Sequence, residues 1–173
     1  MIRKGQLNLY KLTLLYYLEY TFTTPIKMII LEQKVAFCCQ NPGGLSSGFD
    51  FRFGRCAGLT VVTLEDKNVK SVNFVENSAA QSFGGAGVET ASLVGNLSLN
   101  ALVLGFLGPN AVLALKHVPG LKVLWLRNNK TYTVKEALDL YLAGSLPEIK
   151  EANVNPHHGM GMGQGQGSRF GIQ

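Results

Sequence analysis

The 173-residue chain has few charges and few metal-ligating side chains: 16% of its residues are charged, and it holds three cysteines, three histidines and one tryptophan. An odd, small number of cysteines does not make a disulfide framework and indicates a reducing compartment. No CxxC pair occurs, so the cysteine spacing gives no sign of a thiolate-bound cluster. We therefore predict a cytoplasmic protein without disulfides.

Long apolar runs are also missing, which argues against a membrane-spanning helix. The N-terminal segment imitates a signal peptide, because Arg3 and Lys4 precede an apolar stretch. Lys11 interrupts that stretch, Glu19 closes it, and no cleavage site of small residues follows. We predict neither export nor a membrane partner.

The formal net charge of +5 is unevenly distributed along the chain. Residues 1–27 carry four basic side chains and one acidic side chain, whereas residues 28–150 carry eleven basic and nine acidic ones. Most of the excess positive charge thus lies outside the segment that we expect to fold. A basic groove for phosphate backbones is not indicated, and we predict no nucleic-acid partner.

Catalytic arrangements are missing as well. No GxSxG, Ser-His-Asp or Cys-His pattern is visible. A two-metal nuclease needs clustered carboxylates, whereas Asp50, Glu65, Asp66 and Glu76 fall in expected loops or at strand ends. We predict that the protein is not an enzyme.

The hydrophobic pattern indicates an α/β domain, since 46% of the residues are hydrophobic and strand-like runs alternate with helical ones. The expected elements are a strand in the second half of 29–39, a hairpin of 59–64 and 69–76, helices over 88–97, 111–118 and 133–144, and strands at 101–104 and 121–126. Thr133 and Glu136 fit a capping box. This order predicts a mixed sheet with helices on both faces, the arrangement of ribonuclease H-like domains.

Three segments are expected to make up the chain. Residues 28–150 form the α/β domain that would bind a cofactor. Residues 1–27 are either an extension from an upstream start codon or a helix specific to this protein. Residues 151–173 are rich in Gly, Met, Gln and His without periodicity, which predicts a flexible tail.

Three motifs in the domain suggest an anion site. The apolar strand before Gly108 ends in Gly108-Pro109-Asn110 and opens into a helix, and Pro109 suits a first helical position. Gly84, Gly85 and Gly87 precede another helix, so free N–H groups would lie at both junctions. The third motif is the loop Phe51–Arg55, with two arginines. The alternatives are a tight glycine turn and solvated loop arginines.

Taken together, these motifs resemble the dinitrogenase iron-molybdenum cofactor biosynthesis family over roughly residues 28–147. The resemblance implies a small protein that binds, stores or transfers an iron-molybdenum or related metal-sulfur cofactor or its precursor. It also implies cluster donor and acceptor proteins as partners. The cofactor-binding residues that we predict are Arg52, Phe53, Gly54, Arg55, Gly84, Gly85, Gly87, Gly108, Pro109 and Asn110.

One position departs from the family pattern. The family loop often reads His-Phe-Gly-Arg, with the histidine as candidate cluster ligand, and Arg52 stands in its place here. A guanidinium cannot coordinate a metal, although it can hold an anion through charge-assisted hydrogen bonds. The alternative function is therefore a regulatory or interaction module that keeps the fold without a cluster.

Four side chains are candidate metal ligands. Cys38 and Cys39 are adjacent on a predicted strand, so they point to opposite faces and at most one can face a given pocket. Free cysteines are also common as small core residues. In the tail, His157 and His158 precede two methionines, and imidazole with thioether suits a soft or borderline metal. A glycine-rich tail without chemistry is the alternative.

Overall fold

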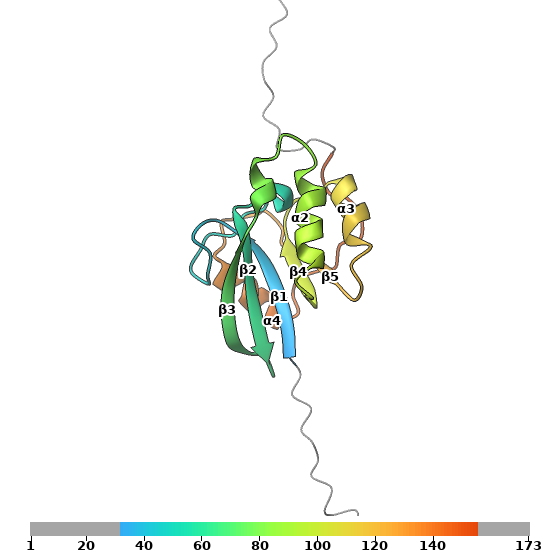
Figure 1. The fold of residues 1–173 in the computed structure, drawn as a ribbon. Coiled ribbons are helices and arrows are strands. Elements are labelled where there is room, and N and C mark those ends of the chain that lie inside the picture. Colours follow the sequence, from blue (N-terminus) through green and yellow to red (C-terminus); the bar gives the residue numbers. More distant parts are fainter. Residues whose placement is uncertain (1–31, 156–173) are drawn as a thin grey trace, which may run out of the picture. The chain divides into compact units, whose positions relative to one another are not determined.

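The computed structural model describes residues 32–155, which form a five-stranded sheet with helices packed against it (Figure 1). The strands are β1 (Glu32–Cys39), β2 (Gly58–Glu65), β3 (Asn68–Glu76), β4 (Ala101–Leu104) and β5 (Lys122–Trp125). The helices are α2 (Ala86–Gly95), α3 (Pro109–Leu115) and α4 (Val134–Leu142), with short 3-10 helices η1 (Phe53–Arg55) and η2 (Ser78–Gln81).

The sheet has the strand order β3-β2-β1-β4-β5. β1, β2 and β3 pair antiparallel, whereas β4 and β5 run parallel to β1. The hairpin between β2 and β3 turns tightly through Asp66 and Lys67, which both have positive φ. The predicted mixed sheet is confirmed, and so is its hairpin.

Helices cover both faces of the sheet. Figure 1 shows α2 and α3 in front of the strands and α4 behind them. On the rear face, the Tyr141 hydroxyl of α4 donates to Gln33 Oε1 of β1 at 3.2 Å. The predicted arrangement of helices on both faces is confirmed, while the ribonuclease H-like assignment stays a prediction.

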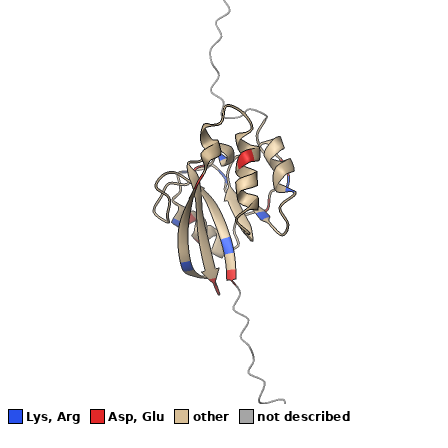
Figure 2. Cartoon of the chain, in the orientation of Figure 1, with Lys and Arg blue, Asp and Glu red and all other residues tan. Residues whose placement is uncertain are grey.

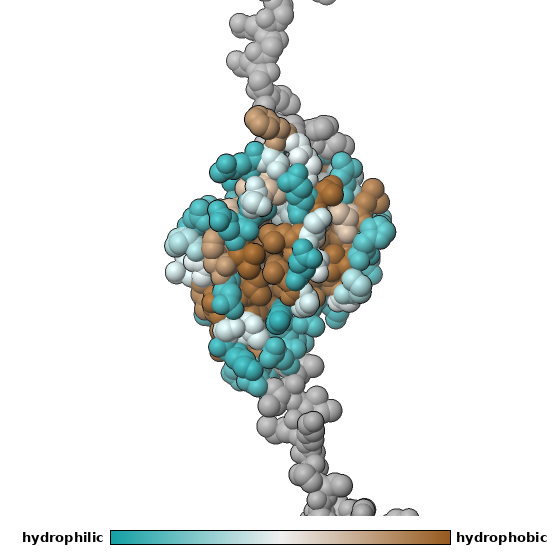
Figure 3. Space-filling model, viewed as in Figure 1, coloured by the Kyte–Doolittle hydropathy of each residue, from teal (hydrophilic) through white to brown (hydrophobic). Residues whose placement is uncertain are grey.

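The core lies between the sheet and its helices. All four residues of β4 and the last five residues of β1 are buried, as expected for strands covered on both faces. Figure 3 shows apolar side chains gathered in the middle of the viewed face, with polar ones around them. The capping box at the start of α4 is confirmed, because Thr133 Oγ1 accepts from the Glu136 N–H and the Glu136 carboxylate accepts from the Thr133 N–H.

Some predicted boundaries differ from the structure. α3 begins at Pro109 and ends at Leu115, three residues before the predicted end, because the backbone tightens into turns before Pro119. Between the predicted strand 69–76 and the predicted helix 88–97, the structure has η2 and the start of α2, which begins at Ala86. Residues 1–31 and 156–173 lie outside the described part, so the predictions for the N-terminal segment and for most of the tail are not tested. Within residues 32–155, no helix has the length and apolar character needed to span a membrane.

Candidate functional site

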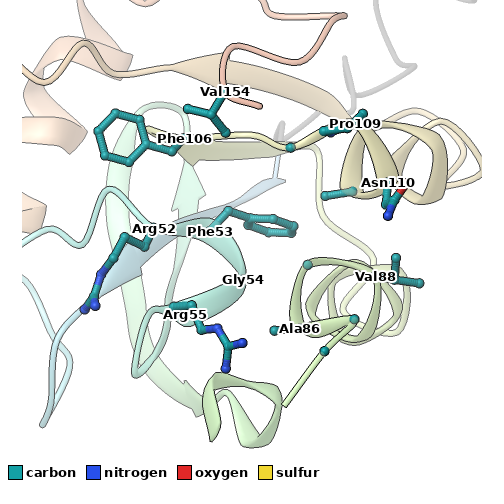
Figure 4. Close-up of a pocket in the computed structure, with 15 residues that line it drawn as sticks. Arg52, Phe53, Gly54, Arg55, Ala86, Val88, Phe106, Pro109, Asn110 and Val154 are labelled. Carbon is teal, nitrogen blue, oxygen red and sulfur yellow. The ribbon is translucent and has the colours of Figure 1, made fainter. Parts of the chain in front are cut away.

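A pocket of about 200 Å³ opens where three loops converge (Figure 4). The loop after β1 supplies η1, the glycine loop leads into α2, and the third loop joins β4 to α3. The lining consists of Arg52, Phe53, Gly54, Arg55, Gly84, Gly85, Ala86, Gly87, Val88, Phe106, Gly108, Pro109, Asn110, Ala111 and Val154. All ten residues that the sequence predicts as cofactor-binding are thus brought together, and their binding role stays a prediction.

Strand direction explains this convergence. β1 and β4 are parallel neighbours, so their carboxyl ends meet at one edge of the sheet, where ligands gather in open α/β sheets. At that edge the two following loops are joined directly. The Phe106 N–H donates to the Phe51 carbonyl at 2.6 Å, and Arg52 and Phe106 form an isolated parallel bridge.

Gly54 allows η1 to lie against the first turn of α2. A Cβ atom on Gly54 would lie 2.7 Å from the Gly87 nitrogen and 2.9 Å from the Gly87 Cα. Real Cβ atoms do not approach so closely, and the obstacle is backbone that no rotamer change can move aside. Glycine at position 54 is therefore a requirement of packing at the pocket floor.

The start of α2 presents donors to the pocket. Gly85 is the N-cap with φ of 75°, and its carbonyl accepts from Val88 at 2.8 Å and Glu89 at 3.0 Å. The amides of Ala86 and Gly87 come before the Val88 and Glu89 amides in the first turn of α2. Amides at this position have no hydrogen-bond partner within the helix itself. Since the helix dipole also places partial positive charge here, this wall favours an anion.

Arg52 lines the pocket, but its guanidinium is engaged elsewhere. Its Nε donates to Asp50 Oδ1 at 3.0 Å and a terminal nitrogen donates to Asp50 Oδ2 at 2.8 Å. The hydrogen bonds that Arg52 donates to the Asp50 carboxylate, together with the negative charge of that carboxylate, raise the pKa of Arg52. Figure 4 shows this side chain running away from α2 and α3. Its positive charge is thus largely offset by buried Asp50.

Arg55 has a different role. One terminal nitrogen donates to the Ala80 carbonyl at 2.9 Å and the Ser82 carbonyl at 2.5 Å, which fixes the glycine loop against η1. Its neighbours in these contacts are carbonyl groups, so its full charge remains close to the N-terminus of α2. Figure 4 shows the guanidinium beside Ala86. Arg55 is therefore the main cation of the site.

The structure adds Val154, a residue that the sequence analysis missed. It follows Asn153, whose side chain accepts from the Leu107 N–H at 2.7 Å and donates to the Gly105 carbonyl at 2.7 Å. The Asn153 N–H also donates to the Leu107 carbonyl at 3.0 Å. In the described part of the predicted tail, Asn153 is hydrogen-bonded to the residues that follow β4, and the flexibility of the tail from residue 151 stays a prediction. The sequence analysis missed this contact because a single asparagine in a polar segment shows no hydrophobic periodicity that would predict packing.

Comparison with known proteins identifies the family. The model of the family described as dinitrogenase iron-molybdenum cofactor matches residues 33–144, which include all three helices and the whole sheet except Glu32, the first residue of β1. The chain belongs to this family. The pocket described above is formed almost wholly within the matched residues.

Three relatives of the family member described here illustrate the similarity. The orange protein from Desulfovibrio gigas, solved in its apo form, superposes with a TM-score of 0.62 at 31% identity, covering 70% of this chain and 97% of that protein. A Thermotoga protein solved by NMR has a TM-score of 0.57 at 27% identity, covering 70% and 97%. An uncharacterized protein of Methanocaldococcus jannaschii is 31% identical over 98 residues, which are 57% of this chain and 80% of the relative.

The cysteines lie in the core of this family member and do not line the pocket. Cys38, Cys39 and Cys56 are free thiols with no exposed surface. Cys39 Sγ donates to the Gly58 carbonyl at 3.4 Å and accepts from the Thr60 hydroxyl at 3.1 Å. Hydrogen bonding with Cys56 and burial raise the pKa of Cys38 well above its ordinary value, which favours the neutral thiol over the metal-binding thiolate. This geometry does not favour Cys38 or Cys39 as ligands.

Within residues 32–155, no group of three or more His, Cys, Asp or Glu side chains is placed to hold a metal ion. His157 and His158 lie outside the described residues, and their role stays a prediction. Figure 2 shows basic and acidic side chains interspersed on the viewed side, without a basic stripe. The charge of the pocket is therefore a local property of its lining.

Proposed function

We propose that this protein binds an anionic metal-sulfur cofactor, or a precursor of one, as a carrier that passes it between donor and acceptor proteins. The observation that carries the proposal is the pocket itself. Among residues 32–155, the charged residues of the lining are Arg52 and Arg55 alone, no carboxylate lines the pocket, and the lining includes the first turn of α2. Membership of the iron-molybdenum cofactor family supports a metal-sulfur complex as the anion that this pocket binds.

The hydrogen-bond donors of the lining suit an anionic metal complex better than a bare metal ion. Backbone N–H groups and the Arg55 guanidinium can hydrogen-bond to sulfide or oxide ligands of an anionic complex. A bare metal ion would need soft or anionic ligands, and the described part of the chain contributes no Cys, His, Met, Asp or Glu to the lining. The cargo that fits is thus a complex that already carries its own sulfur or oxygen ligands.

The proposed carrier performs no covalent chemistry on its cargo. It works in the cytoplasm, which agrees with three buried, unpaired thiols. Loading and release then depend on the affinity of the pocket and on contact with the partner proteins.

The test begins with protein purified without oxygen, whose metal content and visible spectrum are measured. Apoprotein is then titrated with tetrathiomolybdate, a small anionic metal-sulfur complex with strong visible absorption. We expect saturable binding to the full chain. Salt should weaken the binding, because the attraction is partly electrostatic.

A pair of variants locates the binding. Gly108 has φ of −81°, and a Cβ there meets nothing within 4 Å, so Gly108→Leu fills the pocket without a backbone clash. Gly95→Leu places the same side chain on an exposed position at the end of α2, outside the lining. We expect at least tenfold weaker binding for Gly108→Leu and wild-type binding for Gly95→Leu. Equal binding by both variants would place the complex elsewhere.

The second candidate function is an interaction module without cargo. It is favoured by the Asp50 carboxylate, which holds the Arg52 guanidinium away from the helices. Protein that contains no metal after anaerobic purification and does not bind tetrathiomolybdate would support this candidate over a carrier.

A further inference from the structure

A buried hydrogen-bond network joins η1, η2 and α2, three of the elements that build the pocket. Its central residue is Asn77, which is 3% exposed and directly precedes η2. Asn77 Nδ2 donates to the Cys56 carbonyl at 3.0 Å, and Asn77 Oδ1 accepts from the Thr90 hydroxyl at 3.1 Å. Cys56 is the C-cap of η1, and Thr90 is a fully buried residue of α2. One side chain thus bonds to η1 and to α2 at the same time.

The backbone of Asn77 extends this network to the main cation of the site. Its N–H donates to the Ala57 carbonyl at 3.0 Å, and its carbonyl accepts from the Ala80 N–H at 3.1 Å in η2. The Ala80 carbonyl in turn accepts from the Arg55 guanidinium at 2.9 Å. Asn77 is therefore connected through Ala80 to the guanidinium that lies beside the start of α2 (Figure 4).

On the helix side, Thr90 connects the network to the first turn of α2. The Thr90 hydroxyl lies 2.8 Å from the Ala86 carbonyl and 3.1 Å from Asn77 Oδ1. A threonine hydroxyl carries one hydrogen, so the two acceptors share it. Ala86 is the first residue of α2, and its amide and that of Gly87 are the donors that favour an anion in the pocket. The Thr90 hydroxyl thus links the anion-binding turn to Asn77.

Polar side chains at such depth constrain how the surrounding elements pack. Burying an amide or a hydroxyl is costly unless it is hydrogen-bonded, and a fully bonded network permits fewer arrangements than apolar packing does. The close approach of Gly54 to Gly87 limits how near η1 and α2 can come to each other. The bonds of Asn77 act in the opposite direction, because they keep the two elements from separating.

We infer that Asn77 and Thr90 are positioning residues of the pocket, which hold the first turn of α2 and the Arg55 guanidinium at the separation that the anionic cargo requires. Neither side chain lines the pocket, so both act through the groups that do. The inference deepens the proposed function and rests on it, because the two residues set the affinity for the cargo.

The test uses two substitutions of Thr90 that separate its hydroxyl from its shape. Thr90→Val keeps the branched shape without the hydroxyl, whereas Thr90→Ser keeps the hydroxyl. We expect Thr90→Val to bind tetrathiomolybdate about fivefold more weakly than the wild type, a change of the size that one hydrogen bond makes. Thr90→Ser should restore nearly wild-type affinity. Thr90→Ala also lacks the hydroxyl and suits a helix, so it repeats the test if Thr90→Val does not fold.

Thr60→Val is the matched control for a general loss of stability. Thr60 of β2 is equally buried, and its hydroxyl donates to Cys39 Sγ at 3.1 Å and accepts from the Gly44 N–H at 3.0 Å. None of these three residues lines the pocket. We expect Thr60→Val to be less stable than the wild type but to bind with wild-type affinity. Equal weakening of binding by Thr60→Val and Thr90→Val would show that any loosened core has this effect, which would refute the inference.

A double variant tests whether Asn77 and Thr90 act together. Asn77→Ala and Thr90→Val both remove the hydrogen bond between the two side chains, so their effects on affinity should add up to less than the sum in the double variant. Fully additive effects would show that the two residues act separately and would overturn the network.

A second measurement needs no cargo. The NMR signals of the Gly54 and Arg55 amides report the position of η1, which is distant from Thr90 in the chain. Thr90→Val should shift these signals, and Thr90→Ser and Thr60→Val should leave them in place. Unshifted signals in Thr90→Val, or wild-type affinity of this variant, would contradict a positioning role. A wild type that binds no tetrathiomolybdate refutes the proposed carrier, whereas the amide signals still decide whether the network sets the geometry.

Discussion

The contact between Gly54 and Gly87 gives the sharpest test of how the pocket is built. Adding one methyl group in Gly54→Ala places a Cβ at 2.7 Å and 2.9 Å from backbone atoms of Gly87, and at 3.1 Å from the Ala86 carbonyl carbon. All three atoms belong to the first turn of α2, so η1 and α2 have to move apart. Overpacking of this kind costs about 1–3 kcal/mol.

An effect on the unfolded state offsets part of the stability that Gly54→Ala loses by overpacking. Replacing glycine by alanine reduces the freedom of the unfolded chain, which stabilises the fold by about 0.4–1 kcal/mol. The expected net loss for Gly54→Ala is about 1–2 kcal/mol of the free energy of unfolding. In urea, with a slope of about 2 kcal/mol per molar, the midpoint should fall by about 0.5–1 M.

Gly95→Ala is the matched control. Its Cβ would meet only Val118 Cγ2 at 3.7 Å, an ordinary contact, at the C-terminal end of the same helix. We expect this variant to equal or exceed the wild type in stability, because only the unfolded-state effect remains. The same urea titrations, with amide spectra of Ala86 and Gly87, compare the two. If Gly54→Ala is as stable as Gly95→Ala and leaves those amides unshifted, the close approach does not constrain the pocket.

Three further predictions concern the helix cap, the Asp50 pair and the buried thiols. Thr133→Ala should lower the free energy of unfolding by about 1 kcal/mol in denaturant titrations. The hydrogen bond from the Thr133 N–H lowers the pKa of Glu136 in the folded protein. The ionised Glu136 carboxylate therefore stabilises the fold above its unfolded pKa, and this stabilisation is lost as the pH falls through the lower folded pKa. Glu136→Gln should remove this dependence of stability on acid pH. Asp50→Asn should cost about 1 kcal/mol, since exposed Arg52 loses its charged partner, and a double-mutant cycle with Arg52→Gln should show coupling. The raised pKa of Cys38 keeps its thiol neutral in the folded protein, so the free energy of unfolding should fall as the pH rises above the unfolded pKa of about 8.5. In thermal melts from pH 8 to 10, the midpoint of Cys38→Ala should therefore depend less on pH than that of the wild type.

Local patterns were sufficient to predict most of the fold. The apolar run 101–104, the capping box of Thr133 and Glu136, and the hairpin of 59–64 and 69–76 depend on residues close together in the chain, and each appears in the structure as expected. The motifs of the site were also visible, because a glycine loop or a Gly-Pro-Asn turn before a helix has a local backbone function. The sequence alone therefore determined the α/β class, the hairpin and three of the segments that line the pocket, but not the segment that contains Val154.

Tertiary structure decided what those segments do to one another. Gly54 is needed because Gly87, distant in sequence, lies against it, and no local pattern encodes that distance. The charge on Arg52 is offset by Asp50 while that on Arg55 is left near α2, although both arginines look alike in the sequence. Asn153 became part of the site through hydrogen bonds to a strand end 46 and 48 residues away. Such contacts depend on which surfaces the sheet brings together, and this is settled only when the chain has folded.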